Sequence, residues 1–218
     1  MIRFENLTKI FTLNGKSKVV ANNINLTFPT GKAVALLGRN GAGKSTLLQM
    51  IAGTMDATSG RIVSTGTISW PVGFAGSFHG ELTGVQNARF VGRIYGVDTD
   101  ELVDFVEEFS GLGVHFRLPF RTYSSGMKSR LAFAVSMGIG FDTYLVDEIT
   151  AVGDAAFRNK SAQVFRARME HSGAVMVTHS MDQVSELCDA AAVLEDGQLI
   201  YYEDVGQAIA HHNRNMRT

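Results

Sequence analysis

The sequence predicts an α/β fold, in which strands alternating with helices build a sheet that is interrupted by a helical insert. Short continuous apolar runs recur along the chain, as expected for strands that are buried on both faces of a sheet. A glycine-rich loop joins the first of these runs to a helical segment. Between residues 82 and 137 the pattern becomes helical, so we expect a separate helical lobe there.

The first 28 residues are predicted as strands. Asn14-Gly15 is a hairpin turn signal between "KIFTL" and "KSKVVA", and "INLTF" alternates apolar and polar residues up to Phe28. "KAVALLG" is the first continuous apolar run, and "KSTLLQMIAG" follows it with leucines and an isoleucine on one side of a helix. The hairpin signal predicts an antiparallel β region ahead of the main sheet.

The rest of the chain returns to strands after the helical lobe. Within the lobe, Asp98 and Glu101 are placed as a capping box before a helix with apolar residues at helical spacing. "TYLVDE" and "AVMVTHS" are predicted as buried strands, and "VLEDGQLIYY" as a hairpin on Asp196-Gly197. We predict one domain, residues 1–218, with a core of 1–81 and 138–218 and a helical lobe of 82–137.

Composition limits the classes of function. The chain has 20 Lys and Arg against 21 Asp and Glu, so it lacks the strongly basic balance of a nucleic-acid binder. The single cysteine, Cys188, rules out an internal disulfide and fits a reducing compartment. The N-terminus has no signal-peptide apolar region, and the longest uncharged apolar run, Leu131 to Phe141, is about half of a membrane span. We therefore expect any membrane role to come through a partner.

The segment from Gly38 to Ser45 fits G-x-x-x-x-G-K-[ST], the phosphate-binding loop. A polyphosphate needs several converging N–H donors, and a backbone with few Cβ atoms can wrap around it closely. The helix that follows points its positive end at the phosphates. We expect Lys44 to reach the β and γ phosphates and Ser45 to ligate Mg²⁺. The residues predicted to contact the nucleotide here are Gly38, Arg39, Asn40, Gly41, Ala42, Gly43, Lys44, Ser45 and Thr46.

Two further segments supply candidate site residues. "TYLVDE" ends in two carboxylates: Asp147 is expected to hold Mg²⁺ and Glu148 to polarise an attacking water. The alternative interpretation of these two carboxylates is that they are solvated turn residues without a catalytic role. In "YSSGMKSRLAFAV", Ser124 is an N-cap residue and Gly126 lets backbone approach a ligand, which would make a second anion site. Its alternative is an ordinary capped helix.

In this order, the motifs resemble those of the ATP-binding cassette ATPases from Ile2 to about Tyr202. The family signature usually reads L-S-G-G-Q, and "YSSGM" keeps its serine and second glycine. The resemblance implies that His179 is the switch histidine that senses the γ-phosphate, and that Asp154 in "AVGD" belongs to a loop with contacts across a dimer. It also implies that Phe11 stacks on adenine, although a core strand aromatic is the alternative for this residue.

Several stretches, among them "SWPVGF", "LTGVQNARF" and "AVGDAAFRNK", resemble the ATPase subunit of capsular polysaccharide exporters. That resemblance implies ATP and Mg²⁺ as cofactors and a homodimer that joins an integral membrane permease at the cytoplasmic face of the bacterial inner membrane. It implies no nucleic acid, and polysaccharide only indirectly. Teichoic-acid exporters remain an alternative. O-antigen exporters are a less expected alternative, because they often add a C-terminal carbohydrate-binding domain. Soluble cassette ATPases that act on nucleic acid or ribosomes are also less expected, because they usually carry two cassettes or a coiled-coil insert.

Two features depart from the family or stand outside its motifs. From Ile68 to Thr83 no glutamine occurs where these ATPases normally place one, and Phe74 falls near that position. Water and Ser77 are the two alternatives for completing the metal shell, and the sequence assigns neither. We expect Phe78 and His79 nearby to line the groove for the membrane subunit. The alternative for Phe78 is that it packs under the helical lobe. The tail with His211, His212, Arg214 and Arg217 is expected to be solvated.

Overall fold

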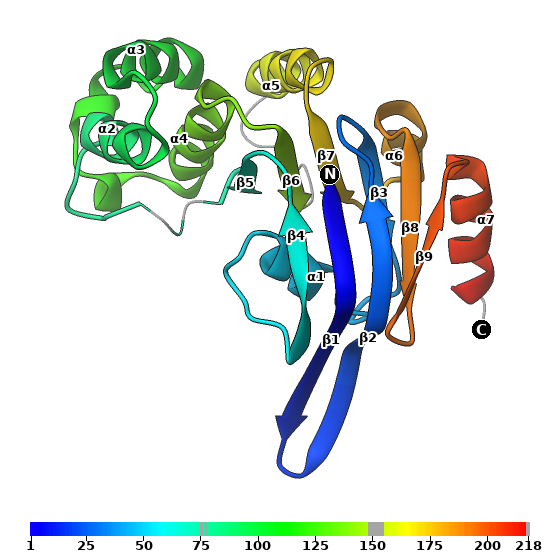
Figure 1. Cartoon of the computed structure of the whole chain (residues 1–218). Helices are drawn as coiled ribbons and strands as arrows, with labels where there is room; N and C mark the ends of the chain where they lie inside the picture. The colour runs from blue at the N-terminus through cyan, green and yellow to red at the C-terminus, as the bar shows by residue number, and fades with distance from the viewer. Residues whose placement is uncertain (75, 77, 148–154, 217–218) are drawn as a thin grey trace. The chain divides into compact units, whose positions relative to one another are not determined.

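The computed structural model describes residues 1–74, 76, 78–147 and 155–216 (Figure 1). Packing divides the chain into two units. The first comprises residues 1–69, 141–148 and 171–218, and the second comprises residues 70–140 and 149–170. The helices of the first unit are α1 (Lys44–Ile51), α6 (Met181–Leu187) and α7 (Val205–Asn215).

A six-stranded, mostly parallel sheet forms the centre of the first unit. Its strands, in spatial order, are β5 (Ile68–Pro71), β6 (Thr143–Asp147), β7 (Gly173–Val177), β3 (Ala33–Leu37), β8 (Ala190–Glu195) and β9 (Gln198–Tyr202). Every residue of β3 and β7 is buried, which is the reason for their continuous apolar runs. The predicted α/β fold class is confirmed.

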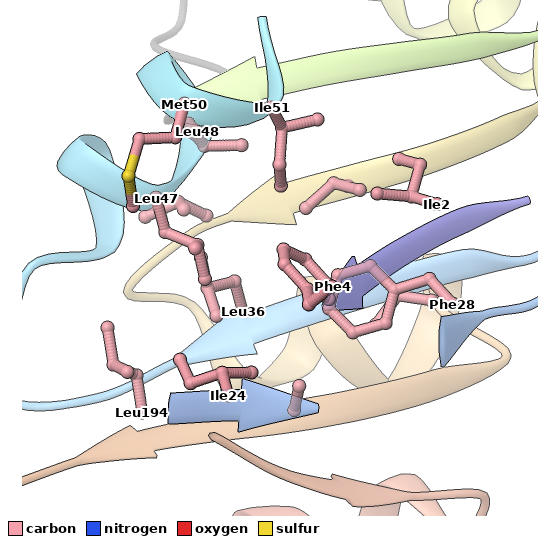
Figure 2. Packing of buried hydrophobic residues seen from close by; sticks show 14 of the residues in the cluster. Ile2, Phe4, Ile24, Phe28, Leu36, Leu47, Leu48, Met50, Ile51 and Leu194 are labelled. Atoms are coloured by element: carbon pink, nitrogen blue, oxygen red, sulfur yellow. The ribbon is translucent and has the colours of Figure 1, made fainter. Parts of the chain in front are cut away.

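The sheet has an apolar core on each face, and β3 contributes to both by alternation. Val34 and Leu36 point to one core, which also holds side chains of α1 and of the N-terminal strands. Ala35 and Leu37 point to the other, which is covered by α6 and α7. Figure 2 shows the first core, where Phe4 and Phe28 lie edge to face with ring centroids 5.1 Å apart. The carboxyl end of β3 is therefore held rigidly from both sides.

The predicted antiparallel region is also confirmed. It is a three-stranded sheet in the order β2 (Lys16–Phe28), β1 (Ile2–Leu13) and β4 (Ser59–Ser64). At the β1–β2 turn, Asn14 and Gly15 have φ values of 49° and 75°, the left-handed conformations that a type I′ hairpin needs. Asp196 and Gly197 make the same kind of turn between β8 and β9.

The second unit is helical. It contains α2 (Gly84–Tyr95), α3 (Thr99–Ser110), the short 3₁₀ helices η1 (Gly113–Arg117) and η2 (Phe120–Thr122), α4 (Ser125–Gly138) and α5 (Ala155–Met169). Asp98 caps α3 as predicted, because its carboxylate accepts from the backbone N–H of Asp100 and Glu101. A full capping box lies at α2 between Thr83 and Gln86.

Helix α5 packs within the second unit, although the sequence predicts residues 138–218 as core. The guanidinium of Arg168 donates to the Met137 carbonyl at the end of α4, at 2.7 and 3.0 Å. Phe157 is buried, with its ring centroid 5.5 Å from that of Phe109 on α3. These contacts join segments that are distant in the sequence, so no local pattern reports them.

The C-terminal tail differs from expectation as well: the prediction that it is solvated is wrong for His211 and His212, whereas Arg214 is exposed as predicted. Residues 205–215 form α7, which packs beside β8 and β9 (Figure 1). Ala208 is fully buried in the second apolar core of the sheet, and both His211 and His212 are partly buried. The pattern of Val205, Ala208 and Ile209 is the buried face of a helix. Arg217 lies outside the described residues.

Asn87 on α2 holds residues 79–83, which precede this helix, by hydrogen bonds to their backbone. Its buried side chain accepts from the His79 N–H at 2.9 Å and donates to the carbonyls of His79, Leu82 and Thr83. Replacing Asn87 by Ala leaves these groups unpaired, so the free energy of unfolding should fall by about 2–3 kcal/mol. Urea unfolding measures the change, with Arg93→Ala on the exposed side of α2 as control. An unchanged midpoint would contradict this role.

Candidate nucleotide-binding site

The predicted phosphate loop, residues 38–45, joins β3 to α1 in the first unit. Two of its glycines are required by close packing. A Cβ on Gly43 would overlap the Val20 side chain, and the φ of 110° there is itself unfavourable for other residues. A Cβ on Gly38 would lie 2.6 Å from the Leu194 carbonyl oxygen. The loop therefore keeps its backbone tightly wound at the N-terminus of α1, where N–H groups favour an anion.

Lys44 is the buried cation of this loop, with only 8% of its surface exposed. Its ammonium donates to the Gly38 carbonyl at 2.7 Å and the Arg39 carbonyl at 3.2 Å. A buried ammonium needs acceptors around it, and phosphate oxygens are stronger acceptors than neutral carbonyls because they carry charge. The position of Lys44 fits a polyphosphate bound in the loop.

Asp147 ends β6, and Ser45 lies in the first turn of α1, which packs against β6 and β7. Both residues are solvent-exposed. Among the described residues, no group of three or more His, Cys, Asp or Glu can enclose a metal ion. A carboxylate and a hydroxyl instead suit Mg²⁺, which prefers oxygen ligands and commonly completes its shell with water and substrate phosphates. The donor set therefore fits the predicted cofactor.

His179 follows β7, the strand that pairs with β3. The residues on each side of it are fixed by hydrogen bonds: the buried Thr178 hydroxyl bonds Gln183, and Ser180 caps α6. This places an exposed imidazole on a fixed backbone at the same edge of the sheet as the phosphate loop. Its role toward a γ-phosphate stays a prediction.

Phe11 on β1 has 40% of its surface exposed, which excludes the alternative of a core aromatic. Opposite it on β2 lies Lys18, whose ammonium donates to the Gly41 carbonyl in the phosphate loop at 2.7 Å. The ring therefore lies on the strand pair that borders the loop, in a position compatible with adenine stacking. The sequence does not predict that Lys18 lies at the phosphate loop. Only the pairing of β1 with β2 and the position of the loop place it there.

The predicted second anion site lies in the second unit. Ser124 caps α4 as expected, accepting from the Met127 N–H at 3.3 Å. Tyr123, which replaces the usual leucine, is buried and donates from its hydroxyl to the His115 carbonyl at 2.7 Å. Beside the cap is a cavity of about 270 Å³. Its lining residues are Gly111, Leu112, His115, Ser124, Gly126, Met127 and Arg130.

Some predicted residues cannot be placed in this geometry. Glu148, Asp154 and Ser77 lie outside the described residues. Phe78, expected at a docking groove, is partly buried and meets Phe120 edge to face with ring centroids 5.3 Å apart. Its contribution to docking stays a prediction, but part of its surface belongs to the packing of the helical unit.

Residues 21–151 match the protein-family model described as ABC transporter, which includes the phosphate loop, the signature segment and Asp147. The chain belongs to the ABC transporter family. The match covers more than half of the chain, and the resemblance deduced from its motifs is confirmed. Within the described residues, no helix is both long and apolar enough to span a membrane.

Relatives in this family match over nearly the whole chain. The chain is 50% identical to the polysialic acid transport ATP-binding protein KpsT of Escherichia coli, covering 96% of this chain and 95% of that protein. It is 44% identical to the capsule polysaccharide export ATP-binding protein CtrD of Neisseria meningitidis serogroup B, covering 98% and 99%. A dimeric ATP-binding cassette in a post-hydrolysis state, bound to ADP and Pi, shares the fold at 20% identity, with a TM-score of 0.75 over 91% of this chain and 96% of that one.

Proposed function

We propose that this chain is the ATP-hydrolysing subunit of an exporter of capsular polysaccharide. The observation that carries the proposal is the phosphate loop with its buried Lys44, in a chain that resembles capsule export ATP-binding proteins from end to end. The polysaccharide itself is handled only indirectly in this proposal, because the chain supplies the nucleotide chemistry and a permease supplies the path.

Each candidate residue has a separate role in nucleotide chemistry. The loop amides and the N-terminus of α1 bind the phosphates, and Lys44 moves from the loop carbonyls to the charged phosphate oxygens. Ser45 and Asp147 hold Mg²⁺, which when bound offsets the charge of the β and γ phosphates. Glu148 orients the attacking water, His179 contacts the γ-phosphate, and Phe11 supports the adenine ring.

We place the complete site between two copies of this chain. In this arrangement Ser124 and Gly126 of one copy approach the nucleotide held by the phosphate loop of its partner, and Asp154 contributes to the contact. The cap at α4 presents backbone N–H groups beside an open cavity, which suits the terminal phosphate of a nucleotide. The dimeric assembly of the cassette with the same fold supports the proposal.

The membrane partner in this proposal is an integral permease at the cytoplasmic face of the bacterial inner membrane. The helical unit offers apolar side chains for it. Phe90 and Ile94 lie four residues apart on α2, with 51% and 62% of their surfaces exposed, so they share one face of the helix. Exposed aromatic and aliphatic side chains on one face are suitable anchors for a partner helix.

Replacing Lys44 by Ala in a capsule-producing host tests the proposed function. ATPase activity of the purified protein should fall at least ~10²-fold, because a charge that stabilises the transferring phosphoryl group is removed. Surface polysaccharide should be lost while polymer accumulates inside the cells, and the protein should still be recovered with the membrane. Lys16→Ala at the exposed β1–β2 turn is the matched control. Normal surface polysaccharide with inactive ATPase would contradict the proposal.

A further inference from the structure

The C-terminal helix α7 ends at the nucleotide site of its own unit. It starts beyond β9 and returns along the sheet, with its residues packed on β3, β8, β9 and α6. Near its end, His211 Nε2 lies 3.3 Å from Glu195 at the end of β8. The preceding residue of β8, Leu194, has its carbonyl oxygen directly against Gly38, the first residue of the phosphate loop. The last turn of α7 is therefore beside the loop.

His211 fixes the rotation of α7. Its Nδ1 lies 2.9 Å from the Tyr202 hydroxyl on β9, and Asn215 on the next turn is 3.1 Å from its Nε2. One residue further along a helix points about 100° away, so His212 faces a different direction from His211. His212 instead follows Val205 and Ala208, at spacings of seven and four, on the face that packs over β3 and β8.

One ring nitrogen of His212 lacks a hydrogen-bond partner among the described residues. This nitrogen, Nδ1, is shielded from solvent. Burial of the ring lowers the pKa of His212, and the charges of Lys44, His179 and His211 lower it further. Lys44 and His179 follow β3 and β7, whose carboxyl ends lie at the same edge of the sheet as Glu195 at the end of β8, which His211 contacts. The imidazole is neutral at physiological pH and retains one N–H to donate.

An unpaired buried ring nitrogen is costly, so a polar group of this kind is expected to meet its partner in another state of the protein. Lys44 and His179, which lie at the same edge of the sheet as the last turn of α7, are the residues assigned above to the terminal phosphate. A phosphate oxygen bound by them would bring a charged acceptor toward His212. This chemistry explains an imidazole with a shielded nitrogen at a place where a leucine would fill the apolar face without penalty.

We propose that His212 is a further nucleotide-binding residue, whose Nδ1–H donates to the terminal phosphate region next to Lys44 and His179, so that α7 reports whether ATP or ADP is bound. The inference rests on the proposed function, because it requires that the phosphate loop bind nucleotide. A hydrogen bond that exists only with the terminal phosphate strengthens the binding of ATP and leaves that of ADP unchanged.

The test measures the affinity of ATP and of ADP for the full chain in EDTA, where Mg²⁺-dependent hydrolysis does not consume the ligand. His212→Leu should weaken ATP binding about tenfold or more, as expected for a lost hydrogen bond to a charged group, and leave ADP binding as in wild type. His212→Asn should keep the preference for ATP, since its amide N–H occupies the position of Nδ1. His212→Gln, with its amide one bond further, should lose it. Asn213→Leu, on the exposed side of α7, is the matched control.

The possible outcomes separate this inference from the proposed function. If wild type binds neither nucleotide, both are overturned. If wild type binds ATP and His212→Leu has unchanged affinities, or loses ATP and ADP equally, only the role of His212 is overturned. Should the leucine variant fail to fold, the comparison of His212→Asn with His212→Gln decides: equal ATP-to-ADP ratios in these two would reject donation from Nδ1.

Discussion

Replacing Glu148 by Gln is expected to leave ATP binding intact and to slow ATP hydrolysis at least ~10²-fold. The amide preserves the size of the side chain but cannot accept a proton from water, so the attacking nucleophile is no longer activated. Asp147→Asn should behave differently, because it weakens the Mg²⁺-dependent part of binding. Single-turnover hydrolysis and equilibrium ATP binding together distinguish the two carboxylates.

Unhydrolysed ATP should then trap the Glu148→Gln variant as a dimer. If two copies share each nucleotide, ATP remains between them and the dimer becomes stable enough to see by size-exclusion chromatography or light scattering. Glu203→Gln, on the exposed segment before α7, is the control and should hydrolyse ATP like wild type. A Glu148→Gln variant with wild-type single-turnover rates would remove this residue from the chemistry.

Mixing two inactive variants should restore ATPase activity if the site is shared between copies. Lys44→Ala disables the phosphate loop of one chain, and Ser124→Arg blocks the α4 cap of the other. In the mixed dimer, the intact loop of the Ser124→Arg chain meets the intact cap of the Lys44→Ala chain. One of two sites is rebuilt, so activity should rise from background to about half of wild type where the sites act independently.

A reciprocal mixture provides the control. In a dimer of one wild-type chain with one Lys44→Ala/Ser124→Arg chain, neither shared site is intact. Each site combines an intact part of the wild-type chain with a defective part of the double variant. A site formed within one chain would give the opposite pattern, with activity in this mixture and none in the first. Dimers tagged on each chain and purified through both tags ensure that the mixed species is the one measured. Inactivity of both mixtures would mean that a single site cannot act alone.

The sequence alone determined the turns, the helix cap and the buried strands of this protein, because they depend on local interactions. The Asn14-Gly15 and Asp196-Gly197 turns, the cap at Asp98 and the buried strands follow from interactions between residues that are close along the chain. The phosphate loop belongs to the same class, since its backbone shape and the helix after it are encoded within a few residues. For the same reason, the α/β fold class and the family were predictable.

The tertiary structure alone decided contacts between residues far apart in sequence. Lys18 reaches Gly41 only because β2 passes the loop, and α5 joins the helical unit only through its packing on α3 and α4. His212 follows Lys44 by 168 residues, yet the end of the helix that carries it lies beside the phosphate loop. The spacing of Val205, Ala208 and Ile209 is compatible with an amphipathic helix, but it does not show which strands that helix packs against. The physical reason is that hydrogen bonds and turn conformations act over a few residues, whereas the burial of a helix end depends on which strands the whole sheet places beneath it.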